Sequence, residues 1–600
     1  MKTNLSFQRR SIGGYALVTV LAFGAISAAI LGASLTRTIN TAQLNVRNNL
    51  YNVNIRAAEA ATELVVGRMM ADYRIGGDAS VADNLDSYRD LVPDGSQDNY
   101  WSGFEFSNGE GQVGHADVEM ISDREYKPLD AQYYGLQGWA TTYRVSSRAR
   151  QPNSRVPQLT SAIQQDVELD SIPIFEFAIF YNSLLEFTWN DPMTVQGRTH
   201  ANGDIYVGSQ SLLQFDATVT STGTIQSPAW AGKSPSDYTV SPSYHGEPDY
   251  RTNVATLTLP IGTNNTPSAV REIINLRPPG ESIASPMGRQ RYYNKAGVVL
   301  LVTEDTVTAI IKSAPDDGAP TALTAPVTNL AAVGATFPFL SLTNSFWDSR
   351  EQQFMKLTQI DMGKLKNWSE TNPDLLSKRP PASNPFNILY VADLRTTNPS
   401  TNTAVRLRNG GILPTGNGTG FTVATLNPLY IRGNYNITNG ISNTSGSVPA
   451  SVVCDALTIL SVGWKDSESA ENLSSRVAGN TTVNAAIIAG MVYSIGPDAN
   501  SFGGGVRNLP RLLEAWSDSS GGNAKTLAIN GSLVCLFNSI RAVKPFRMAG
   551  DYYYPPNRVF NYDQSFKDPD KLPPGTPALN VLVRSKWVAP PPDTVNYAGD

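Results

Sequence analysis

The chain has 600 residues, of which 41% are hydrophobic and 16% charged, and its formal net charge is −5 at pH 7. This hydrophobic fraction excludes a mainly disordered chain, and the length indicates several domains. The negative charge gives no electrostatic support for nucleic-acid binding. Three histidines and two cysteines are too few for a zinc framework, so we expect no metal and no cofactor.

The N-terminus predicts a membrane segment. Lys2, Arg9 and Arg10 precede residues 12–35, an apolar stretch without charge. About 20 apolar residues span a bilayer as a helix, so this stretch is long enough. A cleaved signal peptide is the alternative, because small residues at 28–34 resemble a cleavage zone. We expect a single-pass protein with the bulk of the chain exported, and cleavage stays open.

A second helical pattern continues beyond the apolar stretch. Residues 38–75 contain no proline, and Gly76 and Gly77 predict the helix end. One apolar stripe comprises Ile39, Ala42, Val46, Leu50, Val53, Ala57, Ala60, Leu64 and Met69. The pattern fits either one continuous helix of roughly 90–100 Å or two helices with a break near Arg37.

The remainder predicts a mainly β protein. Residues 139–145 and 159–169 alternate like strands around a turn at 151–154, which indicates an antiparallel sheet. Further on, short apolar strands with glycine or asparagine corners recur, which is typical of a parallel β-helix solenoid; a β-sandwich is the alternative. These units are residues 194–207, 217–225, 429–437, 457–463, 484–492 and 527–536.

The predicted domain organisation follows from these patterns. Residues 236–415 have a different texture, with a strand at 297–303 and a helix at 348–368, and are interpreted as an α+β insertion beside the solenoid. The C-terminal residues are rich in proline and aromatic side chains and predict a surface strap. The expected units are 1–36 (basic start and transmembrane segment), 37–77 (extended helix), 78–170 (α+β region), 171–235 (first rungs), 236–415 (insertion), 416–545 (remaining rungs) and 546–600 (strap).

Catalytic patterns are weak. His200 lies near Asp204 and could belong to an acid–base pair or a metal site, but a turn histidine is the commoner case. Paired carboxylates are what polysaccharide-active solenoids use, and sequence spacing does not show that any candidates converge. The carboxylate candidates are Glu176, Glu186, Asp204 and Asp216. The glycines at 503–505 lack the lysine of a phosphate loop and predict a turn feeding a short helix, with Pro510 in its first turn. We therefore expect no catalytic residues.

The N-terminal residues resemble a known family. Residues 9–21 and 57–61 are similar to PilX-type pilus assembly proteins and other minor pilins. Later stretches resemble large bacterial proteins with such an N-terminus, namely residues 174–182, 193–206, 428–436, 505–516 and 572–577. The resemblance implies a pilin-like helix and sheet in residues 1–170 and a bacterial inner-membrane protein exposed to the periplasm or cell surface. It also implies prepilin-type processing at Gly14, although the fifth residue after that cut is Thr19 rather than the usual glutamate.

These observations predict a non-enzymatic structural or adhesive component of a type IV pilus-like or secretion-like envelope assembly. A membrane-anchored β-helix hydrolase or lyase acting on polysaccharide is the alternative. The expected partners are the membrane, pilin-like subunits or pilus assembly proteins, and surface glycans, with no nucleic acid. Cys454 and Cys535 each sit beside an apolar strand, and the exported chain would either join them in a disulfide or keep both as buried thiols.

Overall fold

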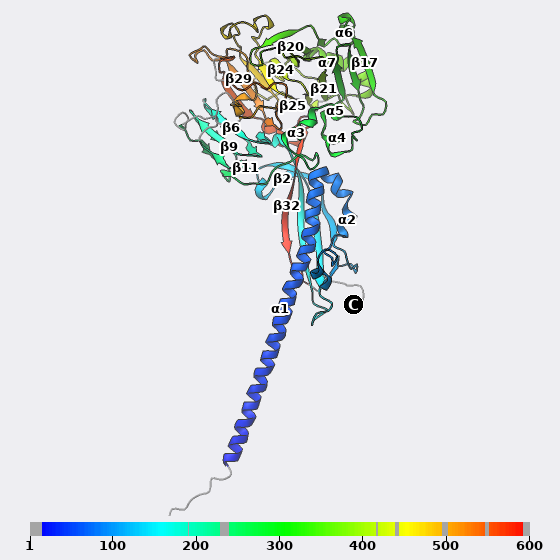
Figure 1. Cartoon of the computed structure of the whole chain (residues 1–600), viewed down its shortest axis with the longest axis vertical. Helices are drawn as coiled ribbons and strands as arrows, with labels where there is room; N and C mark the ends of the chain where they lie inside the picture. Colours follow the sequence, from blue (N-terminus) through cyan, green and yellow to red (C-terminus); the bar gives the residue numbers. More distant parts are fainter. Residues whose placement is uncertain are drawn as a thin grey trace, which may run out of the picture.

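The computed structural model describes residues 15–189, 191–227, 239–415, 418–437, 443–494, 502–546 and 551–591. The chain is mainly β, with one long N-terminal helix that projects like a rod from a head of several sheets (Figure 1). An antiparallel sheet lies beside the upper part of this helix and joins it to the head (Figure 1).

Helix α1 (Tyr15–Ala82) runs without a break through Arg37, which settles the sequence alternatives in favour of one continuous helix. Its 68 residues correspond to a length of about 100 Å. The helical backbone is interrupted at Gly77, where φ is 70°, but the helix resumes and ends at Ala82 and not at the predicted glycine pair. Carbonyl groups near this end accept hydrogen bonds from Arg289 (to Gly76, 3.0 Å) and Asn580 (to Tyr73, 3.0 Å). The helix end is thereby attached to two distant parts of the chain.

The antiparallel sheet covers one face of the C-terminal half of α1. Its strands are β1 (Glu105–Ser107), β2 (Asp117–Pro128), β3 (Gln137–Arg150), β4 (Thr160–Pro173) and β32 (Ala578–Val588). Strands β3 and β4 contain the two stretches in which alternation predicted strands. Strand β32 comes from the C-terminal region and pairs with β4, so part of the predicted strap completes this sheet instead of covering a surface.

The head contains two large, mostly parallel sheets. The first has the order β14-β11-β8-β5-β30-β28-β25-β23-β21-β15-β16-β17, and only its last two pairings are antiparallel. Its strands are β5 (Phe177–Tyr181), β8 (Arg198–Ala201), β11 (Val219–Ser221), β14 (Tyr250–Arg251), β15 (Val298–Val302), β16 (Thr306–Ile311), β17 (Thr321–Pro326), β21 (Ile388–Asp393), β23 (Phe421–Thr425), β25 (Ala450–Cys454), β28 (Ala486–Ala489) and β30 (Leu533–Cys535). The pairing of β30 with β5 joins the two strand blocks that lie far apart in the sequence.

The second large sheet has the order β18-β20-β22-β24-β27-β29-β31, with β19 paired to β20 and β26 paired to β24. Its strands are β18 (Leu340–Ser341), β19 (Ser345–Asp348), β20 (Gln353–Asp361), β22 (Thr401–Gly410), β24 (Leu429–Tyr435), β26 (Leu457–Leu460), β27 (Thr481–Asn484), β29 (Thr526–Gly531) and β31 (Asn557–Tyr562). Two three-stranded parallel sheets complete the head: β6 (Leu185–Trp189), β9 (Ile205–Ser209) and β12 (Ile225–Gln226), and β7 (Met193–Val195), β10 (Leu213–Phe215) and β13 (Ser243–Tyr244).

Residues 236–415 do not form a body packed outside these sheets. Strands β15 and β21 extend the first large sheet, and β20 and β22 extend the second. Residues 353–361 were expected to be helical but form β20, because their register with β22 buries them in a parallel sheet. The helix follows as α7 (Met362–Thr371), capped by the Asp361 side chain. The other helices are α2 (Leu85–Arg89), α3 (Pro267–Val270), α4 (Pro286–Gln290), α5 (Tyr292–Lys295), α6 (Leu330–Thr336) and α8 (Pro373–Lys378).

Asparagine side chains form a ladder along the second large sheet. Asn484 donates to the Asn436 carbonyl at 3.2 Å, Asn530 donates to the Asn484 side chain at 2.7 Å, and Asn561 donates to the Asn530 side chain at 2.8 Å. Asn484, Asn530 and Asn561 share one register position on β27, β29 and β31. Stacked amides of this kind bridge neighbouring strands and fix their register.

Candidate functional site

The N-terminal part of α1 is free of contact with the rest of the described chain, and it forms one part of the candidate site. Every residue from Tyr15 to Asn45 is exposed, and large apolar side chains such as Leu21 (64% exposed) and Leu31 (62%) face solvent. This part of the helix is long and apolar enough to cross a membrane. Such an apolar surface requires a cover, either lipid or other helices.

The C-terminal half of α1 is docked on the antiparallel sheet. Leu50, Ala58, Ala61, Val65 and Met69 are buried and lie on the side that contacts β3, β4 and β32. The predicted apolar stripe is divided between the two parts of the helix: Leu50, Ala57 and Met69 are buried on the sheet, Leu64 is 38% exposed, and Ile39 and Ala42 lie on the free part. The docked face also includes the polar Asn54 and Thr62, which apolar periodicity alone does not detect.

These polar residues anchor the helix to the sheet. Asn54 donates to the Leu159 carbonyl at 2.7 Å, and Gln165 of β4 donates to the Thr62 hydroxyl at 2.9 Å. Gly14, the predicted processing position, lies outside the described residues.

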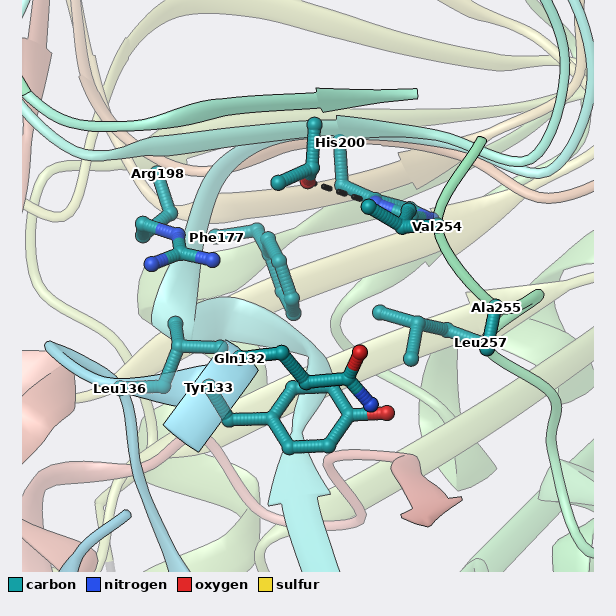
Figure 2. A pocket seen from close by; sticks show the side chains of 10 residues that line it. Gln132, Tyr133, Leu136, Phe177, Arg198, His200, Val254, Ala255 and Leu257 are labelled. Carbon is teal, nitrogen blue, oxygen red and sulfur yellow. Dashed lines mark hydrogen bonds between the residues drawn. The ribbon is translucent and has the colours of Figure 1, made fainter. Parts of the chain in front are cut away.

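His200 is a structural residue. It is buried, with its Nδ1 2.8 Å from the Thr220 hydroxyl and its Nε2 2.9 Å from the Asn202 side-chain oxygen. Burial, aided by the positive charge of Arg198, lowers the pKa of His200 to about 4, so the ring is neutral at pH 7. His200 lines a small cavity together with Phe177 and Leu257 (Figure 2). The cavity measures about 20 Å³, which is room for one water molecule and not for a substrate.

Among the described residues, no hydrogen bond joins any two of the four carboxylate candidates. Glu176 accepts from the Tyr126 hydroxyl and the Gln137 backbone, and burial raises its pKa to about 7. Glu186 accepts from the Ser494 hydroxyl at 2.7 Å, and burial raises its pKa to about 8.

The other two candidates make exposed contacts at the small parallel sheets. Asp204 accepts from the backbone and hydroxyl of Thr224, and Asp216 accepts from the Gln214 amide. Within the described ranges, no group of three or more His, Cys, Asp or Glu side chains is placed to hold a metal ion.

The glycine segment at 503–505 leads into a short 3₁₀ helix, η10 (Gly505–Asn508). A Cβ atom on Gly505 would lie 2.1 Å from the Glu186 carbonyl oxygen, so the glycine permits close backbone packing. Pro510 follows this helix and does not occupy its first turn, which corrects the prediction.

Cys454 and Cys535 are free and buried, which resolves the two sequence alternatives. Cys454 of β25 pairs in register with Ala489 of β28, and the register of β28 with β30 brings Ala489 opposite Cys535. One strand thus lies between the cysteines. Neighbouring strands are about 4.8 Å apart, so the two Cα atoms are about 10 Å apart, beyond the reach of a disulfide.

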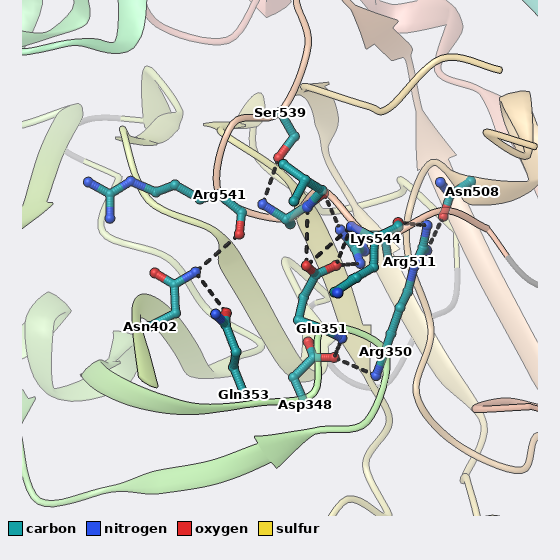
Figure 3. A network of polar contacts seen from close by, with 12 residues as sticks. Asp348, Arg350, Glu351, Gln353, Asn402, Asn508, Arg511, Ser539, Arg541 and Lys544 are labelled. Atoms are coloured by element: carbon teal, nitrogen blue, oxygen red, sulfur yellow. Dashed lines mark hydrogen bonds and ion pairs between the residues drawn. The ribbon is translucent and has the colours of Figure 1, made fainter. Parts of the chain in front are cut away.

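A buried polar network, which the sequence did not reveal, fixes the segment 539–544 (Figure 3). Glu351 forms an ion pair with Arg511 and accepts hydrogen bonds from backbone N–H groups of this segment. Asp455 pairs with Arg271 at 2.8 Å and accepts from the same segment at 2.6–3.1 Å. All of these polar side chains bind other groups of the same chain, so we interpret the network as a structural clamp that holds the segment 539–544.

Two grooves of larger volume lie on the head. One of about 410 Å³ is lined by Trp516, Asp518, Lys525 and Tyr554, among others. The second, of about 390 Å³, is lined by Arg408, Arg432 and polar neighbours. Among the described residues that line these two grooves, Asp518 is the only carboxylate, and hydrogen bonds from Ser520 and Gly522 lower its pKa.

Comparisons of this chain with protein-family models, curated proteins and solved structures found no match.

Proposed function

We propose that this chain is a non-enzymatic structural or adhesive component of a type IV pilus-like or secretion-like envelope assembly. The observation that carries the proposal is the division of α1 into two parts. Its N-terminal part is apolar and exposed, whereas its C-terminal part is buried on an antiparallel sheet. A helix used only to anchor the head would not need a further exposed stretch between the bilayer and the head. Residues 36–49, which are exposed except for the half-buried Val46, form such a stretch, about 20 Å long.

The resemblance of the N-terminal residues to PilX-type proteins supports the same assignment. In this proposal the chain is a single-pass protein of the bacterial inner membrane, with its head exported to the periplasm or cell surface. Its partners are the membrane and pilin-like subunits or pilus assembly proteins, which cover the free part of α1.

The head is proposed to be a parallel β-helix. Support comes from the continuous stacking of short parallel strands in the two large sheets and from the asparagine ladder along one of them. Such a stack is extended and rigid, which suits a surface structure that presents contacts to other molecules.

The alternative, a β-helix hydrolase or lyase, has less support. Glu176 and Glu186 have raised pKa values, as catalytic acids do, but each is buried and satisfied by neighbouring donors. Neither lines the two larger grooves. The raised pKa values are therefore explained by burial alone.

Fractionation and crosslinking in cells that carry the native machinery test the proposal. A photo-crosslinker at Leu44, which is 58% exposed, should capture another membrane-anchored helix. The same probe at Arg155, on an exposed loop beside the sheet, is the control and should not capture that partner. Intact chain in the soluble cytoplasmic fraction, or no partner at Leu44, would contradict the proposal.

A further inference from the structure

The groove of about 390 Å³ on the second large sheet has the dimensions of a ligand site, since such pockets measure about 300–1,000 Å³. Arg408 of β22 and Arg432 of β24 lie opposite each other in its lining. Asn409, Asn434 and Val462 supply amide groups and an apolar surface beside them. Two like charges opposite each other on neighbouring strands destabilise a sheet unless an anion lies between them.

The backbone is distorted at this groove. After the Arg408–Arg432 pair, the next pair in register is Gly410 with Tyr435, so β24 contains one more residue than β22. Gly433, in this bulge, has a φ of 81°, a conformation that favours glycine. β-Bulges open the strand ladder and are common next to binding sites.

Two arginines of strand β22 already bind carboxylates of this chain. Arg406 grips Asp466 with two hydrogen bonds, at 2.5 and 2.8 Å. Arg408 contacts Asp361 at 3.2 Å, and the Arg408 side chain remains 38% exposed. The buried Nε of Arg408 has no hydrogen-bond partner among the described residues.

Arg432 is the arginine without a carboxylate. Its guanidinium donates to the Trp464 carbonyl at 2.8 Å, and among the described residues no carboxylate oxygen lies within 4 Å of it. Burial, followed by the positive charge of Arg406, lowers the pKa of Arg432, although Asp466 and Glu514 oppose this effect. An added anion would relieve this electrostatic strain.

We propose that this groove binds a carboxylate of an acidic polysaccharide, with Arg432 as its main ligand and Arg408 as the second. A carboxylate is the favoured anion because the guanidinium groups of Arg406 and Arg408 on the adjacent strand already bind carboxylates. The asparagine amides and the exposed Val462 suit the hydroxyl groups and face of a sugar ring. The inference rests on the proposed surface role of the chain and names the ligand class that this role would involve.

Binding of the full chain in detergent micelles to polygalacturonate tests the inference by calorimetry. Arg432→Gln should weaken binding at least about tenfold, because it removes a charge-assisted contact. Arg155→Gln removes the same charge from an exposed loop and should leave binding unchanged. Val462→Glu places a competing carboxylate at the groove and should abolish binding, whereas Val462→Ala should retain it. Circular dichroism establishes that the variants are folded.

Methyl-esterified polygalacturonate, which has no free carboxylate, should not bind, and inorganic phosphate should compete less well than galacturonate. The inference is overturned if the native chain does not bind polygalacturonate, if Arg432→Gln binds as the native chain does, or if the ester binds equally. Stronger competition by phosphate would also overturn it, in favour of a phosphate ligand. The Leu44 crosslink is measured in parallel. If the Leu44 crosslink is absent but polygalacturonate binds, only the proposed function is contradicted. If the crosslink forms but polygalacturonate does not bind, only the proposed ligand is contradicted.

Discussion

Met69→Ala tests whether docking on the sheet stabilises the C-terminal half of α1. Met69 has no exposed surface and shares an apolar cluster with Val65, Tyr73, Val167 and Leu169. Truncating a buried methionine costs about 2–5 kcal/mol, because transfer energy is lost and a cavity remains. Since about 1.4 kcal/mol corresponds to a factor of ten, local opening of the docked helix should become at least about 30 times more frequent.

Native-state hydrogen exchange of the full chain in detergent micelles measures this opening. Amides of residues 54–73 should exchange faster in Met69→Ala. Leu44→Ala is the matched control on the free part of the same helix, where the side chain is 58% exposed and the expected change is within about 0.5 kcal/mol. Equal exchange rates at residues 54–73 in the two variants would refute the claim that packing on the sheet stabilises this half of the helix.

Three further predictions concern the head. Glu351→Gln should destabilise it by about 3–5 kcal/mol in thermal unfolding, because Arg511 is left buried without its carboxylate; an unchanged midpoint would contradict the clamp. Thiol labelling of the unfolded, unreduced protein should find both Cys454 and Cys535 free, whereas unlabelled cysteines would indicate a disulfide that the strand order forbids. Burial raises the pKa of Glu186 from 4.5 to about 8, so the unfolded chain releases this proton first and stability falls as pH rises between these values. Glu186→Gln should remove that part of the pH dependence, and parallel stability curves for the two proteins would refute the assignment.

Local sequence signals predicted the elements well where the pattern was strong. The absence of proline predicted a continuous helix, and the pair Gly76 and Gly77 located the interruption of its backbone, after which α1 continues to Ala82, because propensity and capping are local properties. Alternation located β3 and β4 for the same reason. The buried face of α1 is rotated by about one residue from the predicted apolar stripe. Asn54 and Thr62 belong to this face because they form hydrogen bonds with the sheet, which hydrophobicity does not encode.

Long-range pairing could not be predicted from these patterns. Strand β32 pairs with β4, and β30 pairs with β5, although the two strands of each pair are hundreds of residues apart in the sequence. The local sequence of a strand does not specify which strand it will pair with. The helix expected at 348–361 became strands because tertiary pairing with β22 overrides weak local preference. The Arg408–Arg432 groove depends on the register of such strands and therefore has no local signature. The asparagines that recur near strand ends in the sequence could have predicted the asparagine ladder.

Crosslinking of an Ala28→Leu, Ala29→Leu double variant tests the central claim most directly. Both alanines are exposed on the free part of α1, where small side chains allow close approach of neighbouring helices. The larger side chains should preserve membrane insertion, because hydrophobicity rises, but weaken crosslinks to pilus-type partners in cells with the native machinery. Val18→Leu with Val20→Leu, which changes size little on the same helix, should leave the crosslinks intact. Unchanged crosslinks in the alanine double variant, or no partner for the native chain, would show that α1 is only an anchor.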